Sequence, residues 1–209
     1  MGVALVAPSY QIKNINTMNC NNKITEDILQ NCADLPKKGL AGSKAVIVNY
    51  SDIDFTSTTV SGATITNLEL VSGASGLKLE WFKDLASTNS TFAANTEDID
   101  GFTHSFLSRI SNTSAYSAER ANELKNSRVV MVVQTKYAGV DGADAFKVYG
   151  FENGLVLSEM TTNSNENSSS ILFTLASGEG EVEQYPYLVL NEGTYATNKA
   201  SYDSLFAAV

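Results

Sequence analysis

The 209-residue sequence contains few of the residues on which catalytic and metal centres are usually built. It has one histidine, His104, and two cysteines, Cys20 and Cys32. Two cysteines are too few for a cysteine-based metal cluster; they can form one disulfide, but two reduced thiols are the favoured interpretation. His104 lies between Phe102 and Phe106 in a segment expected to be a strand, where a buried structural histidine is more common than a catalytic one. The sequence therefore predicts no enzyme.

Basic residues and long apolar runs are also scarce. Fourteen Lys and Arg stand against 23 Asp and Glu, for a net charge of −9. This charge argues against a protein that binds nucleic acid or anionic membranes, which needs a basic surface. It suits a protein past which DNA slides, because like charges suppress adhesion. No apolar run approaches the roughly 18 residues of a membrane span, and residues 1–8 lack the features of a signal peptide. We therefore expect synthesis and folding in a cytoplasm.

Acidic residues gather in three places that could suggest a metal site. These are Asp52 with Asp54, Glu97 with Asp98 and Asp100, and Asp141 with Asp144. None of the three has the ligand, glycine and terminal glutamate spacing of an EF-hand, so solvated loop charges are the expected outcome. The glycines do not open a helix in a phosphate-binding pattern. No catalytic residue, cofactor site or metal site is predicted.

The second half of the chain is rich in β-branched and aromatic runs separated by Gly, Asn and Asp clusters. From Arg128 to Ala176 this pattern predicts a four-strand antiparallel meander. Its strands are expected over 128–137, 145–151, 155–160 and 170–176. One face is expected to pack on the core. The other face carries polar residues such as Gln134, Lys136, Glu159 and Thr161, and is expected to meet solvent or a lumen.

The first half predicts further strands. They are expected over 44–50, 64–70, 77–82 and 101–110, with 64–70 and 77–82 joined as a hairpin around Ser72–Gly76, and a later edge segment over 185–190. Leu77, Leu79 and Trp81 alternate with charged residues and are expected to face the core. The polar segment 84–100 is too long for an ordinary hairpin loop, so it is either a functional loop or contains another strand.

One helix is predicted over 115–126. Ser114 is placed as its N-cap, and Ala118, Ala121 and Leu124 recur on one face. This narrow stripe of small residues predicts a helix that lies flat on a sheet. The chain is expected to divide into an N-terminal arm over 1–42, a β domain over 43–190 and a C-terminal tail over 191–209, with a short helix near 203–207.

Three segments resemble a known family. They are Phe102-Thr-His-Ser-Phe106, the helical Ala118–Lys125, and Ala145–Met160 with its G-x-E-x-G-L turn at Gly150 to Leu155. In these segments and in their order of sheet, helix and sheet, the chain is similar to virion structural proteins of tailed phages that infect Bacteroidetes-type bacteria, and resembles the tail tube family. The resemblance covers residues 44–190.

The resemblance implies a mainly β fold with one flanking α-helix, as a β-sandwich or rolled β-barrel of tail-tube type. It implies six copies in a ring, rings that stack through the arm, a long loop and the tail, and a lumen that conducts phage DNA without specific binding. The expected partners are other copies of the chain and other virion tail proteins, with no membrane, and the expected location is the viral tail. The long polar arm at 1–42 departs from the family's pattern.

Other functions stay open. The inner tube of a contractile injection system would share the fold, and so would a virion ring or connector protein. A β-sandwich module that binds carbohydrate belongs to a different class; it is expected to expose aromatic side chains, whereas Trp81 is placed toward the core.

Overall fold

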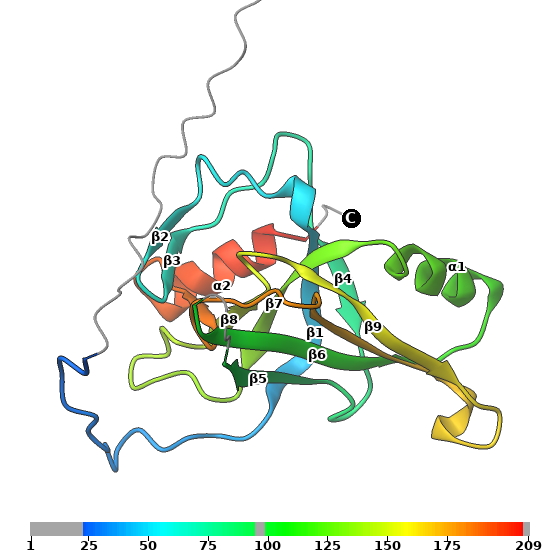
Figure 1. The fold of residues 1–209 in the computed structure, drawn as a ribbon, viewed down its shortest axis with the longest axis horizontal. Coiled ribbons are helices and arrows are strands. Elements are labelled where there is room, and N and C mark those ends of the chain that lie inside the picture. The colour runs from blue at the N-terminus through cyan, green and yellow to red at the C-terminus, as the bar shows by residue number, and fades with distance from the viewer. Residues whose placement is uncertain (1–22, 95–98, 207–209) are drawn as a thin grey trace, which may run out of the picture.

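The computed structural model describes residues 23–94 and 99–206, which form a mainly β domain with an extended N-terminal segment (Figure 1). The strands are β1 (Leu40–Asn49), β2 (Thr59–Ser61), β3 (Thr64–Asn67), β4 (Leu77–Glu80), β5 (Ser87–Ala93), β6 (Gly101–Ile110), β7 (Arg128–Thr135), β8 (Phe146–Tyr149), β9 (Leu155–Thr162), β10 (Ile171–Ser177) and β11 (Leu188–Leu190). The α-helices are α1 (Ala115–Leu124) and α2 (Tyr195–Ser204), and two short 3-10 helices are η1 (Tyr50–Asp52) and η2 (Asn167–Ser169).

Strands β1 and β7 form the centre of the domain and are buried on both faces. They pair antiparallel, with Val46 opposite Val132 and Ile47 opposite Met131. Val46 and Val132 pack into one hydrophobic cluster, whereas Ile47 and Met131 pack into a second cluster. Because successive side chains of a strand point to opposite faces, only a continuous apolar run can serve both clusters. This explains the uninterrupted apolar runs Ala45–Val48 in β1 and Val129–Val133 in β7.

The first cluster is covered by α2. Tyr202 is fully buried and packs against Phe146, with ring centroids 5.0 Å apart. Thr194 caps the helix, since its side chain accepts the backbone N–H of Thr197. Residues 195–206 of the segment expected to be a tail therefore belong to the domain. The helix begins at Tyr195, well before the short helix expected near 203–207.

The second cluster lies beneath β6, β9 and β10, which fold over the central strands as the other layer of a sandwich (Figure 1). Phe106, Phe173 and Leu175 are fully buried in it, and Trp81 is also buried, as expected. The sheet path runs from β2 to β5, and these two strands do not pair with each other. The expected mainly β fold with a helix at its flank is confirmed, and among the described residues the sheet is open rather than closed into a barrel.

The predicted meander is correct in its strands and wrong in its order. Strand β7 lies between β8 and β9, and β8 and β9 do not pair with each other. The Gly150–Gly154 turn carries the chain from one layer to the other instead of closing a hairpin. Gly150 and Gly154 both have positive φ values, of 73° and 76°. A Cβ at Gly150 would lie 2.6 Å from Leu155 Cγ, so this turn requires glycine.

One strand pairing and one edge position expected from the sequence are also wrong. Strand β4 pairs with β1, and β3 pairs with β2 and β11, so no hairpin joins β3 to β4. Strand β11 lies between β3 and β8 rather than at an edge. The turn residues at Ser72–Gly76 predict a local hairpin, but β4 pairs instead with β1, which is a longer strand with an apolar run. The segment 84–100 does contain a strand, β5, which pairs with β6.

Helix α1 begins where the sequence predicts. Ser114 is the N-cap and accepts the backbone N–H of Ser117 at 3.2 Å. The helix ends at Leu124, two residues before the expected end. Its buried residues are Ser117 and Ala121, whereas Ala118 faces solvent. The packed face is small, as expected. It includes Ala121 and Leu124 of the predicted stripe, with Ser117 in place of Ala118.

Candidate assembly surfaces

His104 is buried and serves the fold, as the sequence predicts. Its Nε2 lies 2.9 Å from the carbonyl oxygen of Tyr185, and its Nδ1 accepts the backbone N–H of Gly150 at 3.1 Å. The ring is therefore neutral, with the proton on Nε2. Burial lowers its pKa. Both ring nitrogens are occupied by backbone groups, which leaves neither of them for a nucleophile or a metal.

Glu183 fixes the same turn from the other side. Its carboxylate accepts the backbone N–H groups of Glu152 at 2.8 Å and Asn153 at 3.0 Å. The side chain is almost fully buried, and burial raises the pKa of Glu183 to about 7 although the two N–H donors oppose the shift. His104 and Glu183 thus satisfy three backbone donors of the Gly150–Gly154 turn. These two residues explain structurally why the G-x-E-x-G-L segment is ordered.

Glu183 is expected to make the domain less stable as pH rises from about 4.5 to 7. Its pKa is about 7 in the folded state against 4.5 when unfolded, so the folded state holds more protons across that window. A shift of that size corresponds to a loss on the order of 3 kcal/mol. In Glu183→Gln the loss is expected to disappear, leaving a constant cost for one missing acceptor. Denaturant unfolding at pH 5 and pH 7.5 measures the difference between the two proteins.

His104 acts in the opposite direction, because its lowered folded pKa means that stability is lost as pH falls through the unfolded value of about 6.5. The contribution of His104 is the same in both proteins, so it cancels when the free energy of unfolding of Glu183→Gln is subtracted from that of the parent at each pH. An unchanged pH slope in Glu183→Gln would show that Glu183 does not titrate in the window.

The acidic groups singled out in the sequence are not brought together. Asp54 accepts the backbone N–H groups of Thr56 and Ser57 and the Ser57 hydroxyl, which lowers the pKa of Asp54. Within the described part of the chain no three His, Cys, Asp or Glu side chains could hold a metal ion. Glu97 and Asp98 lie outside the described residues, as does Cys20. Cys32 is exposed.

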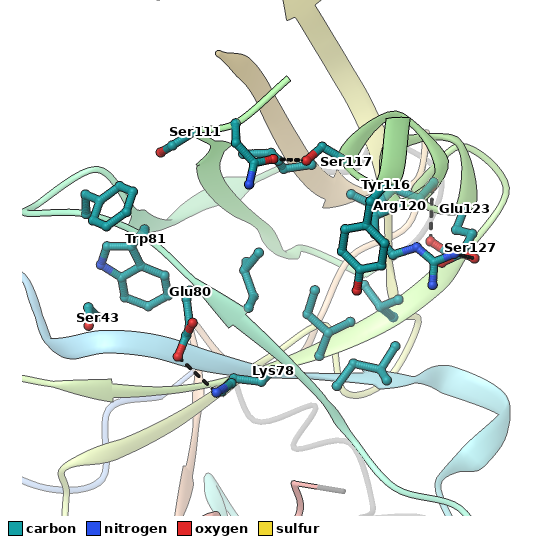
Figure 2. A pocket seen from close by; sticks show the side chains of 18 of the residues that line it. Ser43, Lys78, Glu80, Trp81, Ser111, Tyr116, Ser117, Arg120, Glu123 and Ser127 are labelled. Atoms are coloured by element: carbon teal, nitrogen blue, oxygen red, sulfur yellow. Dashed lines mark hydrogen bonds and ion pairs between the residues drawn. The ribbon is translucent and has the colours of Figure 1, made fainter. Parts of the chain in front are cut away.

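A cleft of about 1150 Å³ separates β4 from α1 (Figure 2). Ile47 and Val129 lie at its base, and both are buried. Its rim is apolar and exposed: Leu77 on β4 is 54% exposed and Tyr116 on α1 is 67% exposed. Phe82, which follows β4, is 68% exposed. Exposed apolar side chains that gather around a hollow are typical of an interaction site.

The charges of the cleft balance. Lys78 pairs with Glu80 at 3.0 Å on β4, and Arg120 pairs with Glu123 at 2.7 Å on α1 (Figure 2). These are the four charged residues that line it, so its net charge is zero on a chain of net charge −9. The cleft is thus neutral overall, although the chain as a whole is acidic. The outer edge of β4 is unpaired in the described structure, since β4 pairs only with β1.

The described N-terminal segment, Lys23–Gly39, leaves the domain without forming a helix or a strand, and we call it the arm (Figure 1). It is held at its base, where Tyr137 donates its hydroxyl to Asp34 at 2.7 Å. This bond raises the pKa of Tyr137 to about 12. Beyond that base three aliphatic side chains face solvent: Ile24, Ile28 and Leu29 are each at least 80% exposed.

Strand β5 presents an unprotected edge. It pairs with β6 along its full length, and its other edge is free in the described structure. Its sequence, Ser-Thr-Asn-Ser-Thr-Phe-Ala, contains no charged residue and no proline. Charges and prolines are the usual devices that stop an edge strand from pairing with another chain. Phe92 on this strand is 59% exposed.

Neither the cleft nor the β5 edge was predicted from the sequence. The cleft combines residues of β1, β4, α1 and β7, whose separate patterns give no sign of a shared surface. The β5 edge had one available signal, which was the excessive length of the polar segment 84–100.

Comparison with known proteins does not place the chain in a family. No family model, curated protein or solved structure matches it. No helix of the described residues is both long and apolar enough to cross a membrane.

Proposed function

We propose that this chain is a non-enzymatic, self-assembling subunit of a phage tail tube. Six copies, the number that the family resemblance implies, form each ring, and the stacked rings conduct DNA. The observation that carries the proposal is the unprotected β5 edge. A seven-residue edge without charges or proline is an aggregation hazard in a monomer, whereas a neighbouring copy in a closed ring would pair it.

Two further features support a tube. The arm exposes aliphatic side chains that a monomer would leave in water, as expected of a segment that docks on another subunit. The net charge of −9 suits a conduit, because it repels the phosphates of passing DNA. An inner tube of a contractile injection system and a virion ring or connector protein would use similar surfaces. The tail tube is preferred because of the resemblance at 102–106 and 145–160.

A charged β5 edge is expected to prevent ring formation. The double variant Asn89→Lys with Thr91→Lys places two positive charges at exposed positions of β5. These charges would have to be brought against the strand of the neighbouring subunit, which disfavours pairing at the ring contact. We expect the variant to remain folded and to elute as a monomer, where the parent elutes as a ring or larger assembly. Size-exclusion chromatography with light scattering measures the mass of each.

The matched control is Thr161→Lys with Glu159→Lys, which changes the charge at two exposed positions of β9 that pair with β10 and lie outside the proposed ring contact. It is expected to assemble like the parent. A monomeric parent at high concentration, or a β5 variant that assembles normally, would contradict the proposal.

A further inference from the structure

Aromatic side chains border the cleft on both of its walls. Tyr116 on α1 and Phe82 just after β4 line it, and both are largely exposed. Trp81 also lines the cleft, on the side opposite Tyr116 (Figure 2). An aromatic side chain offers a large contact area at a low cost in conformational entropy, because only two torsions have to be fixed. The cleft therefore presents rigid apolar surfaces to a ligand from two sides.

The ring of Tyr116 is oriented before any ligand binds. The Arg120 guanidinium lies over this ring, 5.2 Å from its centroid, and Arg120 is itself paired with Glu123 at 2.7 Å. A cation above the face of an aromatic ring is attracted by the ring electrons. Because Tyr116 remains largely exposed, Arg120 orients the ring without covering it. Such preorganisation favours binding, since less side-chain freedom is lost when the ligand arrives.

The charged groups of the cleft form two matched pairs. Lys78 with Glu80 on one wall, and Arg120 with Glu123 on the other, each place a cationic donor beside an anionic acceptor (Figure 2). These side chains are 46–63% exposed, so each pair can also bond to a ligand. A hydroxyl group is both a donor and an acceptor, and its hydrogen bonds to charged groups are the stronger kind. Neighbouring hydroxyls of a sugar can therefore use both members of each pair.

The charge of the cleft separates the possible classes of ligand. An anionic ligand would meet no net positive charge in the cleft and a chain of net charge −9 around it. A purely apolar ligand would remove water from the four charged side chains without replacing their hydrogen bonds. A neutral sugar chain presents apolar ring faces and hydroxyl edges together. The cleft volume, about 1150 Å³, lies above the roughly 300–1,000 Å³ of most small-molecule sites and suits several linked sugars.

We infer that the cleft between β4 and α1 binds a neutral oligosaccharide. Tyr116 and Phe82 pack against the apolar faces of the sugar rings, and the two ion pairs bond to the hydroxyls. This carbohydrate site goes beyond the proposed assembly and does not depend on it, because every residue that lines the cleft belongs to one chain.

Affinity electrophoresis of the full-length protein gives the first test. Native gels contain one soluble polysaccharide each: galactomannan, xyloglucan, starch or yeast mannan as neutral probes, and polygalacturonate as an acidic probe. We expect at least one neutral polysaccharide to retard the protein and polygalacturonate to leave its migration unchanged. No retardation by any of the four neutral probes would overturn the inference, whether or not the protein forms rings.

The fluorescence of Trp81, the only tryptophan of the chain, then reports on the cleft itself. A hexasaccharide of the retarding polysaccharide is titrated into the parent and its variants. Tyr116→Ala and Phe82→Ala are each expected to raise Kd about tenfold or more, as for the loss of an aromatic anchor. The matched control is Phe92→Ala, which removes an exposed phenylalanine of β5 outside the cleft and is expected to bind like the parent. All three altered side chains are exposed, so the variants are expected to fold.

Two results of the titration would overturn the inference. One is a Kd that Tyr116→Ala and Phe82→Ala leave unchanged, which would place the sugar elsewhere on the chain. The other is a change in Trp81 fluorescence with a synthetic peptide of residues 23–31 but none with the hexasaccharide, which would assign the cleft to a peptide. Neither result bears on the proposed tube, because ring formation is measured separately by particle mass.

Discussion

Removing residues 1–31 is expected to abolish stacking of rings while leaving the domain folded. The deletion takes away Ile24, Ile28 and Leu29 but retains Asp34, which anchors the base of the arm to Tyr137. The deleted part that the structure describes is exposed, and loss of exposed residues changes the free energy of unfolding by only about 0.5 kcal/mol or less. We therefore expect an unchanged unfolding midpoint and a particle size that falls from stacked assemblies to single rings.

Point variants sharpen this result. Ile28→Asp with Leu29→Asp places charges where the docked arm would be apolar and is expected to reproduce the deletion. Thr25→Asp with Gln30→Asp adds the same charge at neighbouring positions of the arm and is expected to weaken stacking less. Sedimentation velocity gives the size distribution of each protein. Equal effects of the two pairs would mean that charge, rather than apolar contact, governs stacking.

Tyr202→Ala is expected to cost about 3–5 kcal/mol of the free energy of unfolding, the range for truncating a large buried aromatic residue. Tyr202 is fully buried between α2 and the central strands, packs against Phe146 with the two rings tilted, and donates its hydroxyl to the Lys44 carbonyl at 3.1 Å. Its loss would open a cavity over β1 and release α2. Urea unfolding, followed by circular dichroism, measures the change.

Tyr202→Phe is the matched control, because it keeps the ring and removes only the hydroxyl. Its expected cost is about 1 kcal/mol, the net value of one hydrogen bond. If both variants lost equally little, α2 would be a peripheral tail, as residues 191–209 are interpreted from sequence alone, and the cluster around Tyr202 would not hold the domain together.

The difference between what the sequence predicts and what it misses has a physical cause in each case. The central strands are predicted because burial on both faces demands uninterrupted apolar runs, as in Val129–Val133. Helix α1 is predicted because Ser114 provides a local cap. Neither feature depends on which distant segment packs against it.

Helix α2 is predicted too short and too late in the chain, near 203–207, because its buried face is partly polar. Asn198 is fully buried, where it donates to the Ala143 carbonyl and accepts the backbone N–H of Glu192. A buried asparagine interrupts the apolar period by which a packed helix is recognised. Strand β5 is expected only as one of two alternatives for the segment 84–100, because its Ser, Thr and Asn residues do not alternate with apolar ones.

The order of strands is missed because pairing is a tertiary property. The segments of β7, β8 and β9 each read as strands, but nothing local states that β7 separates β8 from β9. In the structure, β7 comes to separate β8 from β9 because His104 and Glu183 hold the turn at Gly150–Gly154 across from the segment 183–185. The candidate surfaces share this limit, because they exist only after distant segments meet.

Negative-stain electron microscopy of the purified full-length protein tests the central claim most directly. We predict rings with an open centre at low concentration and stacked rings or tubes at higher concentration. A field of separate globular particles at every concentration, with light scattering that gives the 22.4 kDa mass of one chain, would contradict a tube subunit.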